Sequence, residues 1–238
     1  MAFRRLRAWL SRRAWDAFSK GCDGGPISRT GVVWCPISAE WARRMRSVIE
    51  GSEPTRLQSD DRAPGYFYEP RPPIIDYLNR TYDYRLVTST LITELEQFLL
   101  EHEAQISDWI AHPWRVASVR AFVLRANPRE EGGHLDGWPP AMRKAFILPN
   151  GATRETGTTW FRLRNGQEIT FDHPDPCLLL FENSIVEHAA VAGTHERPTI
   201  EIDIVPARRT CPTPVYAGID GWYPWFPHTH ASVPLRSI

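Results

Sequence analysis

The sequence lacks a long apolar run, a net charge and a paired cysteine motif. No apolar run approaches the roughly eighteen residues that a membrane-spanning helix needs. The 28 basic and 28 acidic residues cancel, so no bulk attraction to nucleic acid and no nucleic-acid partner are expected. The four cysteines are scattered without a CxxC pair, which argues against a zinc ribbon or a thioredoxin-type site.

The first twenty residues are basic although the whole chain is neutral. They hold six basic residues and one acidic residue, and Phe3, Leu6 and Leu10 recur at helical spacing. This pattern predicts a basic amphipathic helix that contacts a membrane surface, acts as a transit peptide or docks on the domain. No apolar segment follows it, so a secretory signal is not expected. We expect a cytoplasmic protein, with mitochondrial and membrane-peripheral locations as alternatives, and the sequence leaves the oligomeric state open.

A single amphipathic helix is predicted between Pro73 and Pro113, the longest stretch without proline. Its apolar residues follow i, i+4, i+7 spacing over about twenty residues, and Ser89 or Thr90 can cap it. The apolar positions are Leu91, Ile92, Leu95, Phe98, Leu99, Ile106, Trp109 and Ile110. Such a one-sided helix needs a sheet to pack against.

Short β-prone segments separated by turn signals follow from Pro113 onward. They are residues 116–124, 132–137, 144–151, 157–163, 165–171, 177–181, 185–191 and 199–205. Strands at this spacing are typical of an all-β barrel or sandwich. We therefore expect one mainly β domain with supporting helices, in three parts. Residues 1–112 form a helical and loop region, residues 113–206 the β core, and residues 207–238 a tail rich in proline and aromatic residues.

The segment His134-Leu135-Asp136 has the spacing of two metal ligands. On a strand, residues i and i+2 point to the same side, so one imidazole and one carboxylate can meet at one point. A two-His-one-carboxylate set can hold Fe(II) and leave coordination positions open. The motif is weak alone, because a second copy, His173-Pro174-Asp175, occurs between prolines in a turn.

The residues that follow the first copy strengthen it. A strand at 157–161 precedes the turn Pro174-Asp175-Pro176 and the apolar strand 177–181; His188 lies on the next strand, and Arg197-Pro198-Thr199 opens the last one. This order resembles the Fe(II)/2-oxoglutarate-dependent dioxygenases, in particular the prolyl-4-hydroxylase-like and phytanoyl-CoA-hydroxylase-like branches. The resemblance covers roughly residues 116–206. It implies a double-stranded β-helix, the jelly-roll or cupin-like barrel.

The resemblance also implies roles for individual residues. His134, Asp136 and His188 match the iron ligands, Arg197 matches the residue that pairs with the distal carboxylate of 2-oxoglutarate, and Thr199 could add a hydroxyl donor. The implied cofactors are Fe(II), 2-oxoglutarate and O₂, and the implied partner is a small-molecule or peptidyl substrate. The related halogenases lack the carboxylate, so Asp136 favours hydroxylation.

Several alternatives remain open. Lys144, Thr158 and Thr159 could reach the other end of the co-substrate. Glu201 and Asp203 share the alternating face of Thr199, so either the strand twists outward at its end or its isoleucines face the core. A non-catalytic β-helix binding module, a peripheral membrane protein acting through residues 1–20, and a cupin-type dioxygenase that does not need Arg197 are the competing functions.

Overall fold

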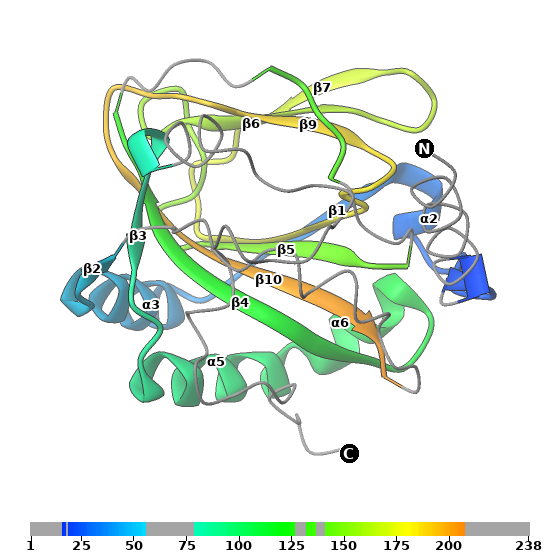
Figure 1. Cartoon of the computed structure of the whole chain (residues 1–238), viewed down its shortest axis with the longest axis horizontal. Coiled ribbons are helices and arrows are strands. Elements are labelled where there is room, and N and C mark those ends of the chain that lie inside the picture. Colours follow the sequence, from blue (N-terminus) through cyan, green and yellow to red (C-terminus); the bar gives the residue numbers. More distant parts are fainter. Residues whose placement is uncertain (1–15, 18, 56–78, 127–131, 137–140, 208–238) are drawn as a thin grey trace, which may run out of the picture.

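The protein is arranged in three layers, a small sheet, a large sheet and a layer of helices (Figure 1). The computed structural model describes residues 16–17, 19–55, 79–126, 132–136 and 141–207. Most of the predicted N-terminal amphipathic helix and of the aromatic tail lies outside these residues. Within them, no helix combines the length and the apolar character needed to cross a membrane.

The large sheet is antiparallel and runs in the order β1-β8-β5-β10-β4-β3-β2. Its strands are β1 (Val32–Pro36), β2 (Pro54–Thr55), β3 (Tyr82–Arg85), β4 (Trp114–Leu124), β5 (Arg143–Leu148), β8 (Cys177–Phe181) and β10 (Arg197–Pro206). The first three lie in the region before residue 113, where only helices and loops were expected. They extend both edges of the sheet, because β1 pairs with β8 and β3 pairs with β4.

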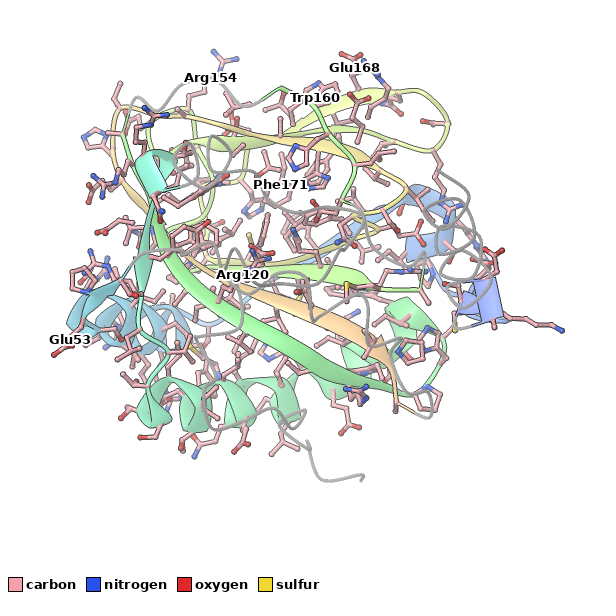
Figure 2. The ribbon with its side chains drawn as sticks, viewed as in Figure 1. Glu53, Arg120, Arg154, Trp160, Glu168 and Phe171 are labelled. Carbon is pink, nitrogen blue, oxygen red and sulfur yellow. The ribbon has the colours of Figure 1, made fainter. Side chains whose placement is uncertain are left out.

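The small sheet has the order β7-β6-β9 and faces the inner side of the large sheet. It consists of β6 (Thr158–Arg162), β7 (Glu168–Phe171) and β9 (Glu187–Val191). Phe171, labelled in Figure 2, joins the apolar core between the sheets. That core also contains Leu148, Ala152, Phe161, Cys177, Leu179, Phe181 and Val186. In the part of the chain that the structure describes, the two sheets stay separate and do not close into one hydrogen-bonded barrel. A mainly β domain with supporting helices is confirmed.

Helices cover the outer face of the large sheet. They are α3 (Ala39–Gly51), α5 (Ser89–Glu101) and α6 (Glu103–Ile110), with the short α2 (Ile27–Thr30) beside β1. The side chains of Ser38 and Thr88 cap α3 and α5 by accepting hydrogen bonds from backbone amides. The predicted single helix is thus capped one residue earlier than expected. It is also interrupted at His102, whose backbone leaves the helical region at φ −102° and ψ 6°.

Strand β10 separates the two cores. Its isoleucines Ile200, Ile202 and Ile204 are fully buried in the cluster that joins the large sheet to the helices. Because successive side chains alternate across a strand, the opposite face carries Arg197, Thr199, Glu201 and Asp203, which are also buried. The second alternative for this strand is therefore correct, and the polar row lies on the side of the small sheet.

Candidate metal centre

The two predicted histidine ligands meet through an isolated β-bridge. The backbone amide of His134 donates to the carbonyl of His188 at 3.0 Å, and the amide of His188 donates back at 2.9 Å. On its other side His188 pairs with Phe161 of β6, which fixes its side chain on the inner face of the small sheet. The two imidazole rings lie 4.5 Å apart between centroids.

Asp136 reaches the same point by the expected alternation. The intervening Leu135 is 53% exposed, whereas the Asp136 carboxylate turns inward. Asp136 Oδ1 lies 3.6 Å from His134 Nε2, and Asp136 Oδ2 lies 3.9 Å from His188 Nε2. One ligand atom from each residue falls within 4.8 Å of the others, so the three residues could hold a metal ion.

Hydrogen bonds orient all three side chains. His188 Nδ1 lies 3.1 Å from the carbonyl of Val186, and His134 Nδ1 lies 3.3 Å from the carbonyl of Gly132. A proton on each Nδ1 leaves the Nε2 lone pairs free for a metal. Asn183 holds Asp136 twice: its backbone carbonyl accepts from the Asp136 amide at 2.9 Å, and its side-chain amide donates to Oδ2 at 3.0 Å.

A glycine allows the His134 segment to lie against the small sheet. A Cβ on Gly133 would stand 2.8 Å from the ring of Trp160 and 2.7 Å from a carboxylate oxygen of Glu187. Trp160 is labelled on β6 in Figure 2. A larger residue at this position would crowd the side chains of Trp160 and Glu187, which would have to shift.

Burial and nearby charges favour the protonation states that bind metal. Burial lowers the pKa of His188 to about 4, so the ring is neutral near neutral pH. Burial alone would raise the pKa of Asp136, but the charge of Lys144 and the hydrogen bonds from Lys144 and Asn183 hold that pKa well below its usual range. The centre therefore offers neutral imidazole nitrogen and an ionised carboxylate.

A buried network of charged side chains borders the centre. Lys144 Nζ lies 2.5 Å from Asp136 Oδ2 and 2.9 Å from Glu201 Oε1. Arg120 hydrogen-bonds the same Glu201 oxygen, and Figure 2 labels Arg120 on β4 between the sheets. The network answers the question raised by the inward acid at position 201, because two cations from neighbouring strands compensate it.

The predicted co-substrate anchor lies on the same inner face. Arg197 is buried and donates through Nη1 to the carbonyl of Gly157 at 2.6 Å. Burial lowers its pKa to about 10, so the guanidinium stays charged. Its Nε and the hydroxyls of Thr199 and Thr159 are buried without a hydrogen-bond partner in the described protein. Because buried polar groups normally find partners, these atoms fit an anionic ligand. Thr158, on the opposite face of β6, does not join them.

Some residues of the centre were not foreseen. Asn183 and Arg120 carry no sequence signal, since one lies in a turn after β8 and the other is an ordinary strand residue. Lys144 was considered only as a contact to the co-substrate. A signal for the network did exist in the inward acid at Glu201, which needed a cation on an adjacent strand.

No family profile and no curated protein matches the chain, but solved structures do. SnoN, a non-heme alpha-ketoglutarate-dependent epimerase from nogalamycin biosynthesis, has a TM-score of 0.55 and 14% identity over 82% of this chain and 84% of that one. A prolyl hydroxylase from Trichoplax adhaerens has a TM-score of 0.54 and 9% sequence identity, with 83% of this chain and 92% of that one covered. HygX from Streptomyces hygroscopicus, with nickel and 2-oxoglutarate bound, has a TM-score of 0.52 and 11% sequence identity, with 77% of this chain and 86% of that one covered.

These likenesses confirm the predicted fold. The chain has the double-stranded β-helix fold of the non-haem iron and 2-oxoglutarate-dependent oxygenases. The identities of 9% to 14% establish the fold and leave the chemistry to be argued from the residues of this chain.

Proposed function

We propose that this chain is a non-haem Fe(II)- and 2-oxoglutarate-dependent oxygenase that hydroxylates an unactivated C–H bond. The observation that carries the proposal is the convergence of His134, Asp136 and His188 within 4.8 Å. They meet on the inner face of a double-stranded β-helix whose last strand begins with a buried arginine.

The three side chains suit Fe(II). Two imidazole nitrogens and one carboxylate oxygen are the donors of the facial triad, which leaves open positions for other ligands. A structural zinc site has four protein ligands, often including cysteine, and leaves no coordination position open. No cysteine belongs to the group of donors found in the described residues. His134, Asp136 and His188 would therefore hold the iron.

The inner face also suits 2-oxoglutarate. The distal carboxylate would pair with Arg197, because a planar guanidinium can give two parallel hydrogen bonds to a carboxylate. The buried hydroxyls of Thr199 and Thr159 could add two further donors, since neither has a partner in the described protein. The ligand would thus satisfy polar atoms that otherwise weaken the fold.

The protein's part in catalysis is to position the reacting groups. Bound together, Fe(II) and 2-oxoglutarate supply the oxidation: O₂ is consumed, 2-oxoglutarate becomes succinate and CO₂, and a substrate C–H bond is hydroxylated. Hydrogen bonds hold the donor atoms of both ligands in place: the carbonyl of Val186 orients His188, and the side-chain amide of Asn183 orients Asp136. The apolar core lies beside the centre, where the Phe181 ring packs against the His188 imidazole with 4.8 Å between the ring centroids.

A small molecule or a peptide is the substrate class we propose. Among the similar structures, HygX is bound to hygromycin B and the Trichoplax adhaerens prolyl hydroxylase to a hypoxia-inducible-factor peptide. The fold therefore accommodates both classes, and the presence of the carboxylate Asp136 favours hydroxylation over halogenation.

The proposal is tested by anaerobic titration with Fe(II) and 2-oxoglutarate, followed on the weak visible charge-transfer band of the ternary complex. We expect the band and O₂-dependent succinate formation in the wild-type protein, and the loss of both in His188→Ala. Arg85→Met, which removes an arginine on the helix side of the sheet, serves as a control. A wild-type protein with neither band nor succinate would instead be a binding module.

A further inference from the structure

Lys144 is the cation nearest to the proposed metal ligands in the described part of the chain. It projects inward from β5, and its side chain is 6% exposed. Its ammonium lies between two carboxylates, 2.5 Å from Asp136 Oδ2 and 2.9 Å from Glu201 Oε1. The proposed iron ligand therefore shares one of its two oxygens with a fixed positive charge.

We propose that Lys144 is a positioning residue that sets the charge of the metal centre, so that the centre holds a metal together with an anionic co-substrate better than it holds the bare metal. The inference rests on the proposed function. It adds the role of an ammonium group that neither binds the metal nor belongs to the predicted ligand set.

The neighbouring strands keep Lys144 in place. Glu201 stands opposite Arg120 in the register of β10 and β4. Its Oε1 accepts a hydrogen bond from Arg120 and forms an ion pair with the Lys144 ammonium. Two cations, Arg120 and Lys144, thus lie among three acids. These are Glu201, Asp136 and the buried Asp203, which stands opposite Lys144 in the register of β10 and β5. Movement of the ammonium away from Asp136 would leave the carboxylates of Asp136 and Glu201 undercompensated in a buried site.

This arrangement has two consequences for ligands. First, Lys144 and Asn183 both bind Oδ2 of Asp136, which leaves Oδ1, 3.6 Å from His134 Nε2, as the oxygen available to a metal. Second, a positive charge within a few ångströms repels a divalent cation and attracts a dianion. The ammonium therefore lowers affinity for the bare metal and raises affinity for 2-oxoglutarate at the loaded centre.

The test removes the positive charge of Lys144 and keeps a side chain of similar length. In Lys144→Met we expect Mn(II), which is stable in air, to bind about tenfold more tightly. We expect 2-oxoglutarate to bind the Mn(II)-loaded protein about tenfold more weakly. Isothermal titration calorimetry gives both constants, and electron paramagnetic resonance of free Mn(II) checks the first. A purely structural lesion would weaken both.

Two further variants keep the test decisive if Lys144→Met folds poorly. Lys144→Arg retains the positive charge, and we expect both affinities to stay near the wild-type values. The double change Lys144→Met with Glu201→Gln removes one charge of each sign, and we expect the Mn(II) affinity to return toward the wild type.

The matched control is Arg85→Met. Arg85 also pairs with a carboxylate at 2.5 Å, that of Asp83. Arg85 stands opposite Ala121 of β4, and Ala121 in turn stands opposite Ile200 on the outer face of β10. Arg85→Met therefore removes an equally close ion pair from the other face of the sheet, and neither affinity should change.

Each outcome decides the question. Affinities that both fall, or that both stay unchanged, in Lys144→Met overturn the role of Lys144 while the metal site stands. If wild-type protein and His188→Ala bind Mn(II) equally, the metal site itself is wrong, and the proposed function falls together with the inference.

Discussion

Alternate residues of the ten-residue strand β10 form two faces of opposite character. Outward, Ile200, Ile202 and Ile204 fill the core beneath the helices. Inward, the buried residues are charged or hydroxylated and begin with Arg197 and Thr199. One strand thus joins an apolar face, which packs beneath the helices, to a polar face, which we propose binds the co-substrate.

The difference between the faces is energetic. Burying an isoleucine contributes about 1.5–3 kcal/mol, whereas a buried polar atom without a partner costs about 1–3 kcal/mol. The inner row meets this cost in two ways. Glu201 is compensated within the protein by Arg120 and Lys144. The Nε of Arg197 and the Thr199 hydroxyl have no hydrogen-bond partner in the described protein, and we propose that the co-substrate supplies one. Changes outside should therefore affect stability, and changes inside should affect binding.

The largest effect is expected at the ligands. His134→Ala, Asp136→Ala and His188→Ala should each abolish succinate formation from 2-oxoglutarate and weaken Fe(II) binding by at least about a hundredfold. Anaerobic metal titration and a succinate assay measure the two losses. Wild-type turnover of 2-oxoglutarate in any of these variants would contradict the assignment.

The next largest effect is expected on the outer face. Ile202→Ala removes a fully buried side chain and should lower the free energy of unfolding by about 2–4 kcal/mol, through lost apolar burial and the cavity left behind. Denaturant unfolding measures the change. At denaturant concentrations below the unfolding midpoint, the Fe(II) affinity of the variant should equal that of the wild type. A weaker affinity would show that a change on the outer face of β10 also affects binding at the inner face.

The anchor should give a smaller effect of a different kind. Arg197→Ala removes a charged, two-pronged hydrogen-bond donor, so the apparent Michaelis constant for 2-oxoglutarate should rise about thirtyfold to a hundredfold, which corresponds to about 2–3 kcal/mol. Steady-state kinetics measure the constant, and Fe(II) affinity serves as the control. An unchanged constant would mean that another residue is the anchor.

Much of the fold and of the proposed centre could be predicted from local sequence patterns. The strands at 177–181 and 199–205 are predicted from apolar spacing, but the side to which each face of the second strand points is left open. The roles of His134, Asp136, His188 and Arg197 come from the resemblance and stay predictions. Side-chain networks could not be predicted in this way. The contact of Arg120 with Glu201 depends on the register of β4 and β10, which are distant in the sequence. The contact of Lys144 with Asp136 depends on the position of Asp136, whose backbone amide is held by the carbonyl of Asn183.

Short elements were missed for a related reason. Strands β1, β2 and β3 hold five, two and four residues. They form through pairing that the local sequence does not show, β1 with β8, β3 with β4 and β2 with β3. The interruption at His102 could not be predicted from the hydrophobic periodicity, because the apolar residues of α5 and α6 follow the same helical spacing on both sides of it. At this position the backbone turns, and His102 Nδ1 lies 2.8 Å from the carbonyl of Phe98.

The smallest effect is expected at Thr199, and it gives the finest comparison of the two faces. Thr199→Val keeps the branched shape and removes a buried hydroxyl without a partner in the described protein, so the unfolding free energy should stay the same or rise slightly. The Michaelis constant for 2-oxoglutarate should rise about threefold to tenfold, equivalent to about 0.6–1.4 kcal/mol, because one donor to the co-substrate is lost. The adjacent Ile200→Val should do the reverse, losing about 0.5–1.5 kcal/mol of stability with an unchanged constant. If Thr199→Val instead loses stability and keeps the constant, its hydroxyl supports the protein and not the ligand.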